Sequence, residues 1–332
     1  MRPHKTSFTW MITPGALVFA ASLAPAETPS PALLVLNKEG SLAIVDPASR
    51  KVVGQVPTGE GPHEVTSSTD GKLAFVGNYG TAQNPGRTIS VIDLAAQKEL
   101  RRVDLGPLRR PHGMAFADGK VYFTAEVNKL VGRYDPASNQ VDWLLGTGQN
   151  STHMVVLSKD GNQIFTSNIG SDSITIMDRG SGPLAWNETV VPVGKGPEAI
   201  DLSPDGKQVW TAHSRDGGVS IIDIASKKVN QTINAQTKRS NRLKFTPDGK
   251  LVFISDLEGG ELVVLDASAR KEIKRMKLGR SPEGILMQPD GSRAYVAVNG
   301  DNYVAVIDLK TLEPAGRISV GSPDGMAWAE RR

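Results

Sequence analysis

Cysteine is absent from this sequence of 332 residues, and histidine occurs only five times. Without cysteine the chain forms no disulfide, no thiolate metal site, no catalytic thiol and no covalent attachment of a c-type haem. The sequence also lacks a large excess of charge of one sign, because 38 basic side chains are nearly balanced by 35 acidic ones. A nearly neutral protein has little nonspecific attraction for nucleic acid or anionic lipid. We therefore expect a fold that depends on its hydrophobic core and that binds nucleic acid weakly at most.

Long apolar runs are missing after the N-terminal segment. That segment carries Arg2 and Lys5, then the apolar run FTWMITPGALVFAASL, then the small residues APA at 24–26. This order is typical of a secretory signal peptide, and the run is short for a membrane span. The sequence predicts a signal peptide over 1–26 and a mature protein over 27–332 that is periplasmic or secreted. After cleavage we expect no membrane span.

A repeat of about 40 to 50 residues runs through the mature chain. Each unit has an apolar run, an Asp-Gly pair, a second apolar run and a segment such as SVIDL, TIMDR or AVIDL. The Asp-Gly pair between short alternating runs predicts a tight β-hairpin, because glycine adopts the positive φ that the turn needs. The units begin at His63, His112, His153, Glu198, Asn241, Glu283 and Asp324. Four short strands at this period are typical of a propeller blade.

The two ends of the chain share the seventh unit. The last unit stops after one strand, GMAWA at 325–329, whereas ALLVLN, SLAIVD and KVVGQV near the N-terminus are three strands without an inner partner. Joining them completes a blade and removes the exposed sheet edges. The sequence therefore predicts an all-β fold of one domain: a seven-bladed β-propeller with four antiparallel strands per blade.

The segments FVGNYG, FTSNIG and YVAVNG, followed by SVID or AVID, carry a family resemblance. Over the whole mature chain they resemble the YVTN-repeat seven-bladed propellers of bacteria and archaea. That resemblance implies the fold. It leaves the function open, because propellers of this shape include the haem-binding propeller of bacterial nitrite reductase, quinoprotein amine dehydrogenase subunits, lactonases, the streptogramin lyase and a periplasmic DNA-binding protein.

The histidines of the mature chain coincide with one mouth of the predicted propeller. The first residues of the units should form a ring around the central channel, and the loop between the second and third strands of each blade returns to the same face. That loop contributes Asn78, Glu126, Asn168, His213 and Asp256. His63, His112 and His153 occupy equivalent positions on three adjacent blades, so we expect them to converge. The carboxylates of Glu198, Glu283 and Asp324 should lie opposite.

Three converging imidazoles suit a divalent metal such as zinc or copper, which predicts a metal site at His63, His112 and His153. The same side chains could instead bind a small anion, with Arg110 and neighbouring cations as partners. The ligand-binding candidates are then Glu198, His213, Asn241, Glu283, Asp324, Arg110, Asn78, Glu126, Asn168 and Asp256. We expect a monomer that binds a metal ion or a small anionic molecule at this mouth.

Three other functions stay open. RPHGM around His112 resembles the Pro-His-Gly segments of the streptogramin lyase, which implies His112 as a candidate base in a metal-assisted lyase or a lactonase-type enzyme. Haem ranks below a simple metal ion, because the chain carries no c-type motif, although imidazole is a common axial ligand. A third alternative is a scaffold that binds a protein partner.

Overall fold

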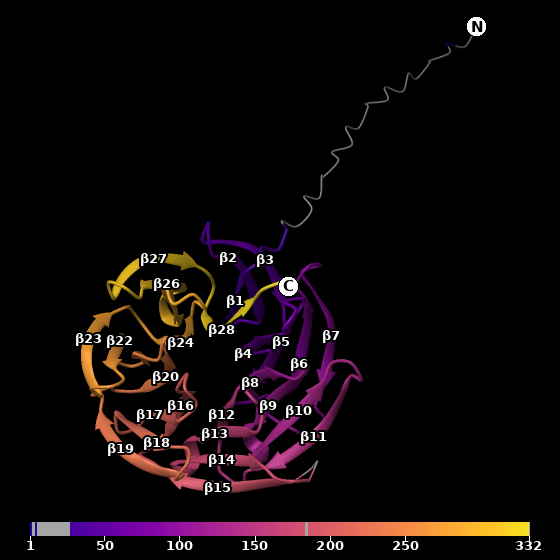
Figure 1. Ribbon diagram of the computed structural model, residues 1–332. Coiled ribbons are helices and arrows are strands. Elements are labelled where there is room, and N and C mark those ends of the chain that lie inside the picture. The colour runs from indigo at the N-terminus through magenta and orange to yellow at the C-terminus, as the bar shows by residue number, and fades with distance from the viewer. Residues whose placement is uncertain (2–3, 5–26, 183–184, 332) are drawn as a thin grey trace.

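The computed structural model describes residues 1, 4, 27–182 and 185–331. The predicted signal peptide over 1–26 thus lies almost entirely outside the described residues. Four-stranded antiparallel sheets follow one another around a central axis, and together they form a closed ring (Figure 1). The prediction of a seven-bladed β-propeller is confirmed.

The first three blades each begin with the strand nearest the axis and end with the outermost strand. Blade 1 contains β4 (Pro62–Ser67), β5 (Leu73–Gly80), β6 (Pro85–Asp93) and β7 (Lys98–Asp104). Blade 2 contains β8 (Pro111–Ala117), β9 (Lys120–Ala125), β10 (Leu130–Asp135) and β11 (Gln140–Gly146), with the 3-10 turn η1 (Glu126–Asn128) after β9. Blade 3 contains β12 (Thr152–Leu157), β13 (Gln163–Asn168), β14 (Ser173–Arg179) and β15 (Trp186–Pro192), with η2 (Ile169–Ser171) after β13.

The next three blades repeat the same order. Blade 4 contains β16 (Pro197–Leu202), β17 (Gln208–His213), β18 (Gly218–Asp223) and β19 (Lys228–Asn234). Blade 5 contains β20 (Ser240–Phe245), β21 (Leu251–Asp256), β22 (Glu261–Asp266) and β23 (Lys271–Lys277). Blade 6 contains β24 (Pro282–Met287), β25 (Arg293–Val298), β26 (Tyr303–Asp308) and β27 (Glu313–Ser319), with η3 (Asn299–Asp301) after β25.

The seventh blade joins the two ends of the chain, as the repeat predicts. Its inner strand is the C-terminal β28 (Pro323–Ala329), which pairs with β1 (Ala32–Asn37) and is followed outward by β2 (Ser41–Asp46) and β3 (Lys51–Pro57). The pairing places Val35 opposite Met326 and Leu33 opposite Trp328. Inner strands of neighbouring blades contact one another all the way around, including β28 with β4 and β24 with β28.

The Asp-Gly pairs lie between the first and second strands of blades 1 to 6, but only one forms a two-residue hairpin turn. At Asp118 and Gly119 both φ angles are positive (51° and 74°), which is the type I′ geometry. The other five pairs lie in longer connections. In the first of these, the Asp70 carboxylate accepts a hydrogen bond from the Lys72 amide and the Ser68 hydroxyl bonds the Leu73 amide. The flanking strands still pair as hairpins and the glycine of each of these Asp-Gly pairs has positive φ, as predicted, but in those five blades the connection is longer than a two-residue turn.

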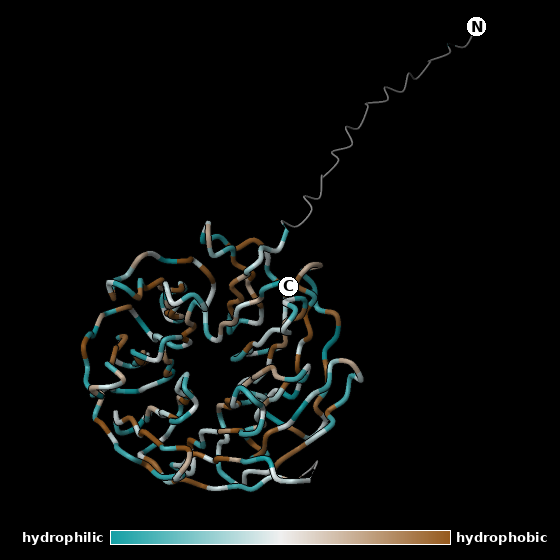
Figure 2. Tube along the Cα trace, in the orientation of Figure 1, coloured by the Kyte–Doolittle hydropathy of each residue, from teal (hydrophilic) through white to brown (hydrophobic). Residues whose placement is uncertain are grey.

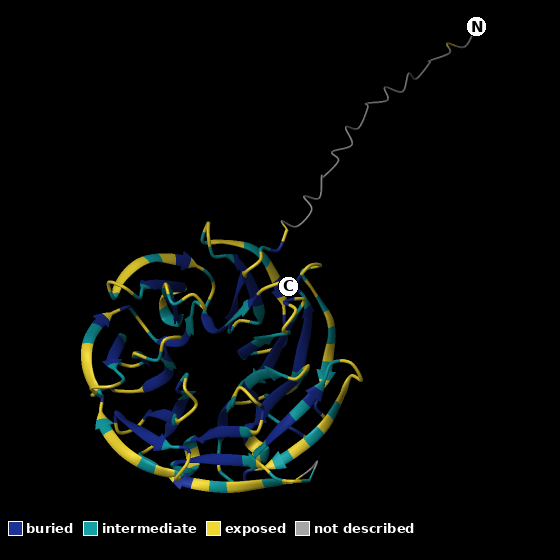
Figure 3. Cartoon of the chain, viewed as in Figure 1, coloured by how far each residue is buried: buried dark blue, intermediate teal, exposed yellow. Residues whose placement is uncertain are grey.

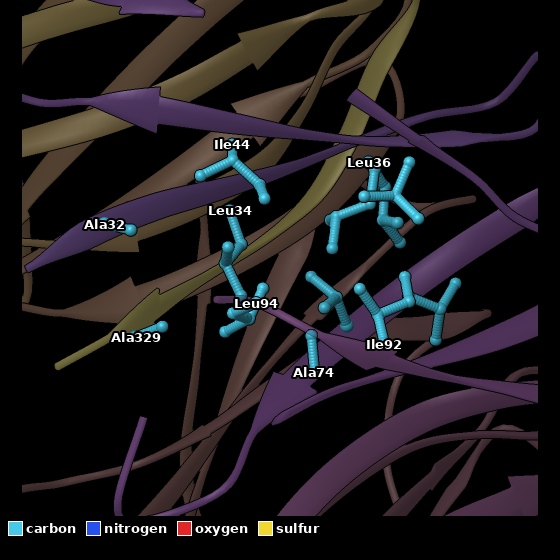
Figure 4. Packing of buried hydrophobic residues seen from close by; sticks show 12 residues of the cluster. Ala32, Leu34, Leu36, Ile44, Ala74, Ile92, Leu94 and Ala329 are labelled. Atoms are coloured by element: carbon cyan, nitrogen blue, oxygen red, sulfur yellow. The ribbon is translucent and has the colours of Figure 1, made fainter. Parts of the chain in front are cut away.

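Hydrophobic stretches recur in every blade, and the outermost strands alternate between exposed and partly buried residues (Figures 2 and 3). The middle strands are buried on both faces because neighbouring blades pack against them. Between blades 7 and 1, Leu34 and Ile44 pack with Ala74 and Ile92, all fully buried (Figure 4). Burial of one such aliphatic side chain contributes roughly 1.5–3 kcal/mol. Interfaces of this kind between neighbouring blades stabilise the ring in the absence of disulfides.

The inner strands of adjacent blades approach so closely that glycine is required. A Cβ on Gly284 would lie 2.2 Å from the Asp324 carbonyl oxygen, and a Cβ on Gly113 would lie 2.8 Å from that of His153. Each glycine directly follows a unit-start residue, so this approach also draws the unit-start side chains of adjacent blades together. The described part of the chain has no helix long and apolar enough to cross a membrane.

Candidate functional site

A cavity of about 550 Å³ opens at the mouth of the propeller. All seven unit-start residues line it, as predicted, together with the second-loop residue Glu126 and the candidate cation Arg110. Arg239, one of the neighbouring cations expected at the mouth, lines it too. The remaining lining residues were not predicted from the sequence: Lys38, Tyr79, Ser151, Ile169, Ser214, Arg215, Arg242, Leu257 and Glu258. This volume lies within the range of pockets that hold small organic ligands.

A left-handed residue turns the chain into several inner strands. The residue two places before the unit start has positive φ in five blades: Gly61 (53°), Arg110 (56°), Ser151 (52°), Gly196 (66°) and Ser281 (52°). Glycine adopts this region without strain, whereas a residue with a Cβ pays roughly 1–2 kcal/mol. Blade 2 therefore keeps the arginine side chain where glycine would be less strained.

Six side chains from three adjacent blades form a histidine arc: His63, Tyr79, Arg110, His112, Glu126 and His153. The ring centroids of His112 and His153 lie 3.7 Å apart, and those of His63 and His112 lie 5.1 Å apart. Tyr79 packs against His63 at 4.6 Å and against His112 edge-on at 5.2 Å. The rings thus stack side by side along one wall of the cavity.

Glu126 holds the last histidine of this arc. Its Oε1 lies 2.5 Å from His153 Nδ1, and its Oε2 accepts a hydrogen bond of 2.5 Å from the Tyr79 hydroxyl. Because a carboxylate only accepts, Nδ1 of His153 carries the hydrogen and Nε2 is the free nitrogen. That Nε2 is buried and has no hydrogen-bond partner among the described residues. The same is true of His112 Nδ1 and Arg110 Nε.

Burial controls the charge of the other two imidazoles. It lowers the pKa of His63 to about 4, against the opposing effect of the Asp324 carboxylate. It also lowers the pKa of His112 well below the ordinary value, with His153 as the next cause. Burial alone would raise the pKa of Glu126, but the hydrogen bonds from His153 and Tyr79 hold it below the ordinary value. At neutral pH His63 and His112 are therefore neutral and the Glu126 carboxylate is ionised.

Five side chains form a carboxylate arc on the other side of the mouth: Lys38, Glu64, Arg242, Glu283 and Asp324. The Lys38 ammonium contacts Glu283 and lies 3.4 Å from Asp324 Oδ2. The same oxygen lies 3.3 Å from His63 Nδ1, which joins the two arcs. Burial, and next the Asp324 charge, raise the pKa of Glu283 to about 8. Asp324 has its pKa held low by Lys38 and Arg242 although burial opposes them.

Arg242 and Glu64 span the channel between non-adjacent blades. Both side chains are buried and form an ion pair, and Arg242 Nη1 also donates to the Asn241 carbonyl at 3.1 Å. Arg242 lines the mouth cavity and also a second cavity of about 330 Å³ that contains Met114, Met154 and Met326. Arg242 therefore lies between the mouth and a lower chamber, whose lining also includes the charged residues Glu64, Asp201 and Lys244.

Glu198 and Asn241 complete the lining between the arcs, where the Asn241 amide donates to Glu198 Oε1 at 2.8 Å. The other predicted candidates do not line the cavity. Asn78, Asn168 and Asp256 are buried and bond polar groups of their own and preceding loops. His213 is fully buried, with Nδ1 2.9 Å from the Asp216 carboxylate, and burial lowers its pKa.

Within the described part of the chain, the structure shows no preformed divalent-metal site at the three mouth histidines. Across residues 27–182 and 185–331, no group of three or more His, Cys, Asp and Glu side chains is arranged to hold a metal ion. The rings pack side by side in tilted orientations, and the Nδ1 atoms of His63 and His153 turn toward Asp324 and Glu126. Their nitrogens therefore do not point at one common centre.

Two sequence signals could have identified the missed residues. In the second loops, Tyr79 directly follows Asn78, and Arg215 closely follows His213. Lys38 directly follows Asn37, which occupies the equivalent position in the blade that joins the two ends of the chain. Arg242 and Glu64 each stand one place after a unit start, where blades 2, 6 and 7 carry glycine instead. A charged residue at the position where these three blades carry glycine therefore indicates a side chain that faces the channel.

Comparisons with known proteins agree with this fold. Residues 128–290, slightly under half of the chain, match the family model described as the cytochrome D1 heme domain. No curated protein matches the chain.

Three solved structures illustrate the similarity. A protein of Bacteroides uniformis provisionally assigned as a 6-phosphogluconolactonase is 17% identical, with TM-score 0.75 over 90% of this chain and 99% of its own. Kuenenia stuttgartiensis hydrazine synthase is 20% identical, with TM-score 0.69 over 80% and 89%. A functionally unknown protein of Desulfotomaculum acetoxidans is 11% identical, with TM-score 0.76 over 92% and 100%. At these identities the similarity establishes the fold alone.

Proposed function

We propose that the mouth of this propeller binds an iron tetrapyrrole of the haem type, and that His153 would be the residue that holds its iron. One observation carries the proposal: Glu126 fixes His153 Nδ1 at 2.5 Å while the buried Nε2 has no partner among the described residues. Metal-binding histidines typically donate their second nitrogen to a carboxylate in this way, because the hydrogen bond fixes the tautomer and orients the ring. This arrangement suits one axial bond rather than the multi-histidine site that the sequence predicts.

The rest of the cavity suits the other parts of such a ligand. His112 packs beside His153 with ring centroids 3.7 Å apart, and its neutral imidazole places no charge next to a bound macrocycle. The guanidinium groups of Arg110, Arg215 and Arg239 line the cavity and can bind peripheral carboxylates, which guanidinium recognises by paired hydrogen bonds. An anionic, metal-containing ligand thus combines the two ligand classes that the sequence leaves open.

The match to the cytochrome D1 heme domain supports the same ligand class, because residues 128–290 include His153. A bound haem supplies one-electron chemistry at its iron. His153 holds the ligand, Glu126 fixes the orientation of that imidazole, and the neutral His63 and His112 exclude bulk water. With the predicted signal peptide, we place this activity in the periplasm or outside the cell.

The experiment is a titration of the purified protein with hemin, followed by its absorption. We expect saturation at one hemin per chain and a Soret band typical of imidazole ligation, and we expect His153→Ala to lose that band. Added imidazole should restore it in His153→Ala. The control His213→Gln removes an imidazole that does not line the cavity and should bind like the wild type. Metal-free protoporphyrin should bind more weakly than hemin. The absence of saturable hemin binding by the wild type would refute the proposal.

A hydrolytic activity is a second candidate, favoured by one observation on the carboxylate arc. His63 Nδ1 lies 3.3 Å from Asp324, so its other nitrogen can act as a general base, while Glu283, whose pKa is raised to about 8, is a protonated acid at neutral pH. Such a pair of a general base and a general acid suits the hydrolysis of a cyclic ester. Turnover of a lactone panel by the wild type, lost in both His63→Ala and Glu283→Ala, would support this candidate, and no turnover would exclude the tested substrates.

A further inference from the structure

Tyr79, in blade 1, lies between the guanidinium of Arg110 and the carboxylate of Glu126, which both belong to blade 2. Its hydroxyl donates to Glu126 Oε2 at 2.5 Å and accepts from Arg110 Nη1 at 3.1 Å. The Arg110 guanidinium also lies 5.0 Å from the centre of the Tyr79 ring. Glu126 in turn holds His153 Nδ1. A continuous hydrogen-bonded chain therefore runs from Arg110 through Tyr79 and Glu126 to His153, across blades 2, 1, 2 and 3.

We infer that Tyr79 is a positioning residue that acts through Glu126 on His153 and weakens the basicity of that imidazole. This inference rests on the proposed haem binding, and it concerns the electronic state of the axial ligand rather than its identity. Tyr79 does not touch the ligand's iron in this role. It controls how strongly the carboxylate attracts the Nδ1 hydrogen of His153.

The directions of the hydrogen bonds carry the argument. Arg110 has only donors, so the lone pair of the Tyr79 oxygen faces Arg110 and the hydroxyl hydrogen is left for Glu126. A second donor on the Glu126 carboxylate lowers its basicity, so it pulls less strongly on the hydrogen of His153. Burial, and next the charge of Glu126, raise the pKa of Tyr79, which keeps the phenol protonated as a donor.

The local backbone agrees with a dedicated role for this chain of contacts. Arg110 has φ 56° at a position where blades 1 and 4 use Gly61 and Gly196. The strained arginine places its guanidinium over the Tyr79 ring, and the short loop of η1 places Glu126, which is 8% exposed, below the phenol. A purely packing role for Tyr79 would need the aromatic ring alone, because the ring already fills the space between His63 and His112.

The test compares two variants whose effects should have opposite signs. In Tyr79→Phe the aromatic ring stays but the hydrogen-bond donor to Glu126 is lost. Glu126 then attracts the Nδ1 hydrogen of His153 more strongly, and the imidazole donates more electron density to the iron. The ferric state of bound hemin is thereby stabilised. We expect the midpoint potential of the hemin complex to fall. In Glu126→Gln the anionic acceptor is lost, so the potential should rise and hemin affinity should drop by about 10- to 100-fold.

The matched control is Tyr134→Phe. The Tyr134 hydroxyl accepts from Arg101 Nε at 3.1 Å and donates to Asn139 at 2.9 Å, which is the same arginine–tyrosine–acceptor arrangement away from the mouth. It should leave the hemin potential unchanged. Shifts of the same sign in Tyr79→Phe and Glu126→Gln, or no shift in Tyr79→Phe, would overturn the inference while hemin binding stands. If the wild type binds no hemin, the proposed function fails first.

Discussion

The two arcs of the mouth are built from the same repeat position, yet they differ in how far their polar groups are satisfied. In the carboxylate arc, Glu283 Oε2 and both carboxylate oxygens of Asp324 lack a hydrogen bond within the described residues, but each faces a cation, either Lys38 or Arg242. Arg242 also binds Glu64. In the histidine arc, His112 Nδ1, His153 Nε2 and Arg110 Nε have no hydrogen-bond partner within the described residues. One arc is closed by internal ion pairs, and the other retains binding capacity.

This difference separates stability from function within one cavity. Buried charges are tolerated when they are paired, and loss of one partner leaves an uncompensated charge. Unpartnered buried nitrogens instead cost free energy until a ligand satisfies them. We therefore expect substitutions in the carboxylate arc to affect mainly folding, and substitutions in the histidine arc to affect mainly binding.

The largest effect should come from the ion pair of Arg242 with Glu64. Arg242→Ala leaves Glu64 buried without its counter-charge, and such losses typically cost about 3–5 kcal/mol. Urea unfolding measures this free energy. The double variant Glu64→Leu/Arg242→Leu should recover most of the loss, because an apolar pair needs no compensation. The control Arg215→Ala, at an exposed rim position, should stay within about 0.5 kcal/mol of the wild type. A loss below about 1 kcal/mol in Arg242→Ala would contradict the contrast between the arcs.

The next effect concerns Glu283 and depends on pH. Its pKa is about 8 in the folded protein against an ordinary value of 4.5, so between these values the folded state holds a proton that the unfolded state lacks. The free energy of unfolding must then fall as pH rises through this window. Because one pKa unit corresponds to about 1.4 kcal/mol, the change is on the order of a few kcal/mol.

Glutamine cannot titrate, so Glu283→Gln lacks this pH-dependent loss. The free energy of unfolding of Glu283→Gln should therefore rise relative to that of the wild type from pH 5 to pH 8, and the difference between the two proteins should be constant above pH 8. Melting temperatures across this range measure the difference. His63 and His112 titrate in both proteins, so their contributions to the difference in stability cancel. Parallel pH profiles for the two proteins would show that Glu283 does not hold this proton.

The sequence predicts the architecture well and the contacts of the mouth poorly, for a physical reason. The spacing of unit starts determines which residues meet at the channel, and the lone C-terminal strand determines how the ring closes. The repeat does not determine which ring nitrogen faces which carboxylate. The pairing of Glu64 with Arg242 depends on the width of the channel, and the stacking of His112 on His153 depends on the close backbone approach at Gly113.

His213 illustrates the same limit. It ends β17 at a position equivalent to Asn78 and Asn168, and these side chains turn into their own loops, where they bond nearby polar groups. Glu126 occupies a comparable place but reaches the cavity, where Tyr79 and His153 bind it. The spacing is alike in the two cases, and the local partners decide whether the side chain reaches the cavity.

The smallest change in stability should come from the histidine arc, and it tests the comparison from the other side. His112 is 2% exposed and its Nδ1 has no partner among the described residues, so leucine removes an unsatisfied polar atom and fills a similar volume. Such a replacement is nearly neutral or stabilising. We expect His112→Leu to change the free energy of unfolding by less than about 1 kcal/mol, in the direction of a gain. Hemin affinity should nevertheless fall, because the imidazole that packs beside His153 is gone. Urea unfolding and hemin titration of the same preparation measure both quantities. A large loss of stability with unchanged hemin binding would mean that His112 serves the fold and that the two arcs do not divide these tasks.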